Sequence, residues 1–150
     1  MKNAISFALL TLFLFSCKEN DAQPPFDNNT FYKNHQASNW TKELGKEHLQ
    51  GKWKLIYTYC CGFGESNNWS AIEDGYFELL FEGDSVTVYM ENNIETKQLW
   101  NFEDRSGNLF YLETEESIPN TFGTMYFSED FLLFNGSPVD GSDNYFKKVK

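Results

Sequence analysis

The sequence predicts an all-β protein built on a closed, eight-stranded antiparallel up-and-down barrel. From residue 51 onward, apolar and aromatic residues alternate with polar ones, which is the period-two pattern of half-buried strands. Turn residues interrupt the pattern repeatedly, and nearly every link has the length of a hairpin. Strands joined by hairpins pair with their neighbours in the chain, and eight of them can close without a free edge. The length of 150 residues suits a single domain.

The first seventeen residues, MKNAISFALLTLFLFSC, are typical of an export signal. Lys2 gives a basic start, and the apolar run over residues 4–15 is too short for a permanent membrane helix. The end of this segment resembles the lipobox of bacterial lipoproteins, whose cysteine is lipidated and becomes the N-terminus. We therefore expect a signal peptide over residues 1–16, acylation of Cys17 with palmitate or a similar chain, and anchoring in the outer membrane of a bacterial cell envelope. An ordinary secretory signal cleaved elsewhere and an uncleaved membrane helix are the alternatives.

Residues 17–40 are expected to hold the lipidated cysteine and a flexible tether. The stretch is polar, contains adjacent prolines and has little to bury. Its Lys18-Glu19 pair resembles the surface-export signal of Bacteroidetes lipoproteins, and both the periplasmic and the surface-exposed face stay open. The barrel domain is predicted over residues 41–150, and it begins with a short amphipathic helix for which Thr41 is a suitable N-cap.

Eight strands are predicted from the alternation. They occupy residues 52–60, 75–81, 85–91, 94–103, 109–114, 121–128, 131–135 and 144–149. Within the first strand, the period of two assigns Trp53, Tyr57 and Tyr59 to one face. We expect that face to point into the barrel.

The motif Gly51-Lys52-Trp53, at the head of the first strand, resembles the GxW signature of lipocalins. The end of the chain is similar to the closing strand of Bacteroidetes lipocalin-like lipoproteins. The resemblance implies a barrel that Gly51 and Trp53 help to close at one end and that admits a small apolar molecule at the other. The arginine that lipocalins place over this tryptophan is missing, and Lys147 or Lys148 is expected to replace it through a cation–π contact.

Aromatic residues make up 18% of the chain, enough to fill such a barrel or to line a pocket. The inward-facing candidates and the loop after the first strand give a candidate ligand-binding set of Tyr57, Tyr59, Phe63, Trp69, Phe77, Leu79, Val88, Gln98, Trp100 and Phe102. Phe63 and Trp69 could cover the open end. The amide of Gln98 inside an apolar barrel must bond either to neighbours or to a ligand. The alternative for the whole set is a packed core that binds nothing.

Cys60 and Cys61 end the first strand and, in an exported protein, meet oxidising conditions. Adjacent strand residues point to opposite faces, so a disulfide between them requires a bend, which Gly62 would favour. A vicinal disulfide, unpaired or packed thiols, and metal ligation or an intermolecular bridge all stay open. A metal is disfavoured, because His35 and His48 have no ligand spacing.

The net charge of −10, without a basic patch, argues against nucleic acid and anionic lipid as partners. The chain has no GxSxG, HExxH, phosphate-binding or dinucleotide-binding motif and no histidine in the barrel strands, so we expect neither an enzyme nor a cofactor. Only carboxylates brought together by the fold would change this. Two functions remain: a monomer that binds a small apolar or amphipathic ligand, and a protein-interaction module, as an inhibitor or accessory subunit of an envelope complex, with a filled barrel.

Overall fold

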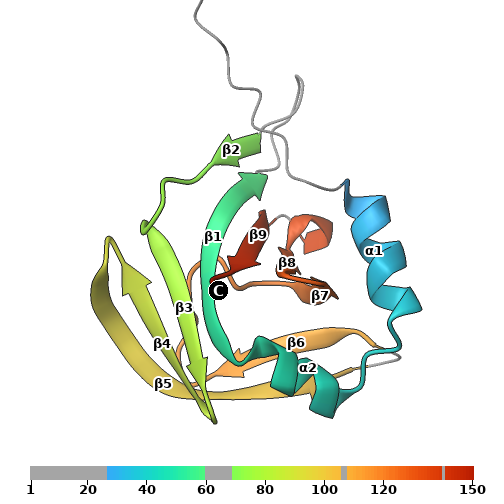
Figure 1. Cartoon of the computed structure of the whole chain (residues 1–150), viewed down its shortest axis with the longest axis horizontal. Helices are drawn as coiled ribbons and strands as arrows, with labels where there is room; N and C mark the ends of the chain where they lie inside the picture. Colours follow the sequence, from blue (N-terminus) through green and yellow to red (C-terminus); the bar gives the residue numbers. More distant parts are fainter. Residues whose placement is uncertain (1–26, 60–68, 106–107, 140) are drawn as a thin grey trace, which may run out of the picture.

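The computed structural model describes residues 27–59, 69–105, 108–139 and 141–150. It is a closed antiparallel barrel of eight strands, with one further short strand and two helices outside it (Figure 1). The strands are β1 (Gly51–Tyr59), β2 (Trp69–Ala71), β3 (Phe77–Glu82), β4 (Ser85–Met90), β5 (Asn93–Asp104), β6 (Phe110–Thr114), β7 (Thr124–Ser128), β8 (Phe131–Asn135) and β9 (Asp143–Lys148). The predicted fold class is confirmed, and the predicted runs overlap all eight strands of the barrel.

Each barrel strand pairs with the next one along the chain, and β1 pairs with β9 to close the barrel. The short strand β2, which the sequence did not predict, lies only against the end of β1, where Tyr59 is opposite Trp69. A single-turn 3₁₀ helix, η1 (Ser137–Val139), links β8 to β9. Within the described ranges, no helix is both long enough and apolar enough to cross a membrane.

The strand β1 changes face in its middle. Leu55 pairs with Phe146, and Tyr57 pairs with Tyr145, so Ile56 is an extra residue that forms a bulge. Leu55 therefore belongs to the barrel core, whereas Tyr57 packs against a cluster on the outside of the barrel. The prediction that Tyr57 and Tyr59 share the inward face of Trp53 is wrong, because the bulge reverses the alternation after Leu55.

Side chains from all eight barrel strands fill the interior. The largest fully buried ones among them are Trp53, Phe77, Phe81, Phe102, Phe110, Phe127, Phe134 and Phe146. Their rings meet mostly edge to face or tilted, as Phe81 and Trp100 do with centroids 5.0 Å apart. The centre of the barrel is consequently a packed core.

The tether prediction is wrong over its last part, because a helix forms there and packs on the outside of the barrel. This helix, α1 (Asn28–Ala37), starts at Asp27, whose carboxylate accepts a hydrogen bond from the Thr30 backbone at 2.7 Å. Its one buried apolar residue, Phe31, packs against Leu133 and Tyr145. Residues 18–26 of the expected tether lie outside the described residues.

A buried polar network joins α1 to the strands β8 and β9. Asp143 in β9 is fully buried. Its carboxylate accepts hydrogen bonds from the side chains of Asn28 and Asn135, both at 3.1 Å, and from the Ser137 backbone at 2.9 Å. Asn135 also donates to the hydroxyl of Tyr32 at 2.8 Å, and burial, reinforced by Asp143, raises the pKa of Tyr32 to about 12. These bonds offset the cost of burying the polar groups, so a largely polar helix can dock here.

The second helix, α2 (Lys42–Leu49), confirms the predicted amphipathic segment. Thr41 is its N-cap and accepts a hydrogen bond from the Leu44 backbone at 3.3 Å. Leu49 is buried in the barrel core. Gly45 faces the Phe102 ring so closely that an added Cβ would lie 2.6 Å from it, which explains a glycine inside a helix.

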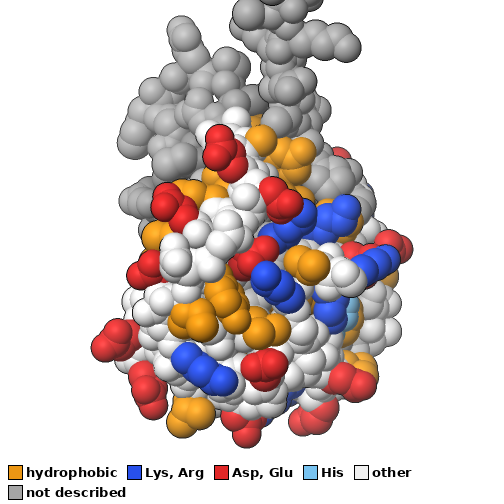
Figure 2. All heavy atoms as spheres, turned by 60° about the vertical axis from the view of Figure 1, so that its left-hand side comes forward, with side chains coloured by type: hydrophobic (Ala, Val, Ile, Leu, Met, Phe, Trp, Pro, Cys, Tyr) orange, Lys and Arg blue, Asp and Glu red, His pale blue; other side chains and the backbone are white. Residues whose placement is uncertain are grey.

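The exterior is mixed in character. Figure 2 shows a face with acidic side chains spread across it and hydrophobic side chains between them. Most of the ion pairs are at the surface, for example Lys46 with Asp84 at 2.6 Å and Lys54 with Asp74 at 2.7 Å. Such exposed pairs contribute little to stability.

Candidate functional site

The barrel wall is incomplete between β6 and β7. These two strands pair at one position only, Phe110 with Met125, whereas every other pair of neighbouring barrel strands shares at least four. Beyond this position, the strands separate and residues 115–123 connect them. We call this incomplete junction the β6–β7 seam.

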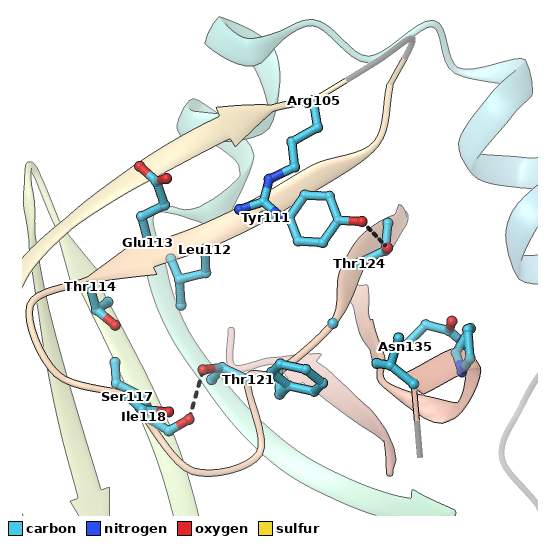
Figure 3. A pocket seen from close by; sticks show the side chains of 14 residues that line it. Arg105, Tyr111, Leu112, Glu113, Thr114, Ser117, Ile118, Thr121, Thr124 and Asn135 are labelled. Atoms are coloured by element: carbon cyan, nitrogen blue, oxygen red, sulfur yellow. Dashed lines mark hydrogen bonds between the residues drawn. The ribbon is translucent and has the colours of Figure 1, made fainter. Parts of the chain in front are cut away.

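A cavity of about 820 Å³ lies in the β6–β7 seam (Figure 3). Its floor includes Leu112 and Ile118, of which Ile118 is part of the barrel core and Leu112 packs against it. Its rim carries polar side chains, chiefly Arg105, Tyr111 and Glu113. We call it the seam cavity. Its volume lies within the range of small-molecule sites, about 300–1,000 Å³.

Hydrogen bonds and a cation–π contact order the polar rim. The guanidinium of Arg105 lies over the Tyr111 ring, 4.3 Å from its centroid, and its Nε donates to Glu103 at 2.7 Å. This bond also lowers the pKa of the Glu103 carboxyl. The hydroxyl of Thr124 donates to that of Tyr111 at 2.9 Å, so β6 and β7 meet again through side chains (Figure 3). The rim therefore presents a guanidinium, a carboxylate and hydroxyls in fixed positions.

The connection over residues 115–123 is fixed by its own hydrogen bonds. Thr121 donates to the Ile118 carbonyl at 2.9 Å, and the Glu116 backbone donates to the Gln98 side chain at 2.8 Å. Gly123 has φ +103° and lies so close to β8 that an added Cβ would be 2.0 Å from the Asn135 carbonyl oxygen. The glycine thus allows the chain to turn into β7 beside the cavity.

Two apolar side chains at the mouth of the seam cavity are largely exposed. Phe122 and Val139 are each 62% exposed. The sequence predicted Phe122 inside a strand and Val139 in a loop, whereas the structure places both in connections between strands. A large exposed aromatic residue beside an apolar cavity is a feature of binding surfaces.

The structure divides the predicted ligand-binding residues between the barrel core and the outside of the barrel. None of those it describes lines the seam cavity. Five belong to the packed core, namely Phe77, Leu79, Val88, Trp100 and Phe102. Tyr57, Tyr59 and Trp69 lie outside the barrel, where the Tyr59 and Trp69 rings are 4.7 Å apart. The amide oxygen of Gln98 bonds to a neighbour, Glu116. Phe63, Cys60, Cys61 and Cys17 lie outside the described residues.

The expected lysine over Trp53 is confirmed. Lys148 Nζ lies 5.1 Å from the Trp53 ring centroid and donates to the His48 carbonyl at 2.6 Å. The indole N–H of Trp53 donates to the Leu49 carbonyl at 2.7 Å. Gly51, which shares the GxW motif with Trp53, has φ +104° at the turn from α2 into β1. These contacts attach α2 to the start of β1 and the end of β9.

Among the described residues, no three His, Cys, Asp or Glu side chains form a group that could hold a metal ion. Comparison with models of protein families, with curated proteins and with solved structures finds no match. The barrel and the seam cavity are therefore the features that bear on function.

Proposed function

We propose that this protein is a membrane-anchored, lipocalin-like lipoprotein that binds a small amphipathic ligand in the seam cavity. The observation that carries the proposal is a cavity of about 820 Å³ whose apolar floor continues into the barrel core and whose rim is polar. The barrel fold supports a lipocalin-like assignment in general form. The ligand enters through the wall of the barrel, since the centre is packed.

The apolar and polar parts of the lining indicate where the apolar and polar parts of the ligand bind. An apolar chain lies on Leu112 and Ile118, and a polar head stays at the rim with Arg105, Tyr111 and Glu113. Eight buried methylene groups contribute about 6 kcal/mol. Part of this is offset by the lost freedom of the ligand, so we expect dissociation constants between about 0.1 and about 1 mM.

Lipid attachment at Cys17 is the second part of the proposal, and the lipobox-like start of the sequence supports it. One acyl chain gives only reversible membrane binding, so durable anchoring requires more than one. Metabolic labelling with palmitate is expected to mark the wild-type chain and to fail for Cys17→Ser. Labelling that persists in Cys17→Ser would contradict the anchor.

Ligand binding is tested with the full chain in detergent, using dodecanoate to displace a fluorescent amphiphile, anilinonaphthalene sulfonate. Ser117→Trp places an indole in the lining of the seam cavity, and Ser70→Trp makes the same exchange on β2, away from it. We expect Ser117→Trp to weaken binding about tenfold or more, which corresponds to about 1.4 kcal/mol, and Ser70→Trp to leave it unchanged. Equal binding by both variants would contradict the site.

The second candidate function is a protein-interaction module of the cell envelope. The filled barrel and the exposed Phe122 and Val139 favour it. Native mass spectrometry of the protein from its own host separates the two functions. A small added mass supports ligand binding, whereas a bare chain found in a complex with another protein supports the interaction module.

A further inference from the structure

The β6–β7 seam has a second link, made by a side chain from outside the barrel. The backbone N–H of Phe127 in β7 donates to Nδ1 of His35 at 2.9 Å. Nε2 of the same ring lies 3.0 Å from the carbonyl oxygen of Asn108, two residues before β6. A carbonyl only accepts, so Nε2 carries the proton and the ring is the neutral Nε2–H tautomer.

The position of His35 follows from the register of the two strands. In an antiparallel ladder that pairs Phe110 with Met125, the next hydrogen-bonded pair is two residues further on, which is Asn108 with Phe127. The imidazole lies between these two residues and bonds to the backbone groups that would otherwise bond to each other. His35 thus replaces one step of the ladder, and it does so on the other side of the Phe110–Met125 pair from the seam cavity.

The surroundings of His35 favour the neutral ring. His35 is 1% exposed and contacts the rings of Phe110, Tyr126 and Phe127, with centroids 5.1–5.8 Å apart. Burial lowers its pKa, although its two backbone hydrogen bonds act in the opposite direction. Trp40 stacks at 6.5 Å on a further side.

Few titratable groups face His35. From β7, the pKa of Tyr126 is raised by burial, so its phenol stays neutral. From α2, His48 contacts the same Phe127 ring at 5.4 Å. At the end of β5, Arg105 bonds through its backbone to Leu109, next to Asn108. Within the described residues, no carboxylate forms an ion pair with His35.

Protonation of His35 is incompatible with this arrangement. A proton on Nδ1 would face the N–H of Phe127, so two donors would point at each other. The charge would also be buried among rings, with no counter-ion among the residues that the structure describes. The protonated ring must therefore leave its position, and because His35 is on α1, the helix loses a contact with β7 at the same time.

We propose that His35 is an acid-sensitive link that keeps the β6–β7 seam closed and that its protonation opens the seam and releases α1 from β7. Release of a ligand from the seam cavity follows from this opening, and that part alone depends on the proposed function. The seam opens increasingly as the pH falls below about 6.5, which is the ordinary pKa of histidine.

The proposal is tested by amide hydrogen exchange of the full chain in detergent, followed by NMR. The protection factor of the Phe127 amide is compared with that of Leu79, in the middle of β3. Between about pH 7.5 and about pH 5, we expect the protection factor of Phe127 to fall about tenfold while it stays below that of Leu79, because the opening is local. A protection factor of Phe127 that does not fall, or that equals that of Leu79 at both pH values, would overturn the proposal.

Two variants assign the effect to His35. His35→Gln keeps an acceptor and a donor but does not titrate, so the acid-dependent loss at Phe127 is expected to disappear. His48→Gln is the matched control, which removes the other histidine and should leave the loss in place. Persistence of the loss in His35→Gln overturns the proposal. If that variant does not fold, the ¹⁵N shifts of the wild-type His35 ring decide, because protonation of Nδ1 must coincide with loss of Phe127 protection.

Dodecanoate binding measured at the same two pH values separates this proposal from the proposed function. Opening of the seam at acid pH, with dodecanoate binding lost at acid pH in the wild type but kept in His35→Gln, supports both. Opening of the seam without dodecanoate binding at either pH contradicts the ligand site and leaves the role of His35 intact. Dodecanoate binding without acid-dependent opening overturns the role of His35 alone.

Discussion

The barrel is closed differently at two of its junctions. At the β1–β9 junction, the strands pair at six positions, and Trp53, Lys148 and α2 pack over it. At the β6–β7 seam, one pair remains, and His35 from α1 supplies further hydrogen bonds. The comparison teaches that side chains and a helix can replace part of a strand ladder. It also shows that the cavity forms where the ladder is missing, as expected if binding sites lie in the less stable parts of a fold.

The largest effect is expected from breaking the firm junction. Trp53→Ala removes a fully buried indole together with its bonds to Leu49 and Lys148. We expect a loss of about 4 kcal/mol in the free energy of unfolding, measured by urea denaturation. Leu99→Ala, at a side chain that is 60% exposed, is the control and should change it by less than about 0.5 kcal/mol. A cost for Trp53→Ala as small as that of Leu99→Ala would mean that this junction is not firm.

The next largest effect on stability is expected at Gly123, where the connection from β6 turns into β7. Gly123→Ala puts a Cβ against the Asn135 carbonyl oxygen at a residue with a positive φ. We expect it to lower the free energy of unfolding by about 3 kcal/mol. Gly83→Ala also has a positive φ, but its Cβ would meet nothing within 4 Å, so its cost should be about 1 kcal/mol. Thermal unfolding of the two variants makes the comparison. Equal costs would show that the close approach at Gly123 yields easily.

A smaller effect is expected at the network that attaches α1. Asp143→Asn keeps the shape of the side chain, but its NH2 group replaces one carboxylate oxygen and then faces either the donor of Asn28 or the donors of Asn135 and Ser137. We expect a cost of about 2 kcal/mol and faster proteolysis within α1. The exposed Asp84→Asn loses only a surface ion pair with Lys46 and should cost less than about 1 kcal/mol. Unchanged proteolysis of α1 in Asp143→Asn would contradict the role of the network.

The smallest effect on stability is its dependence on pH. Burial lowers the pKa of His48 to about 4 and also lowers that of His35, so the unfolded chain binds more protons than the folded one below about pH 6.5. Stability is therefore complete above about pH 6.5 and decreases gradually as the pH falls to about 4. Urea midpoints across this range measure it, and a double His35→Gln, His48→Gln variant should flatten the curve. A slope that is the same in the double variant would assign the effect to other groups.

The barrel could be predicted from the sequence because local alternation and short turns identify its strands. The sequence did not predict the bulge at Ile56, because nothing local distinguishes that residue from its neighbours, and the bulge moved Tyr57 out of the candidate lining. The helix α1 has one buried apolar residue, Phe31, and depends on polar contacts with distant strands, so its sequence is typical of a tether. These features are set by tertiary contacts.

The candidate site shows the same limit. The alternation continues through residues 121–123, so the sixth predicted strand starts early and hides the connection that lines the seam cavity. In the structure, β7 starts at Thr124, after the turn at Gly123. The one local indication of this connection in the sequence was an isolated Phe122 followed directly by Gly123.

An NMR titration of the full chain in detergent with dodecanoate tests the central claim most directly. We expect the amide signals of Leu112, Ile118 and Thr124 at the β6–β7 seam to shift, while those of Trp53 and Lys148 at the β1–β9 junction stay in place. Shifts centred on the β1–β9 junction, or no shifts at the seam at saturating dodecanoate, would contradict it.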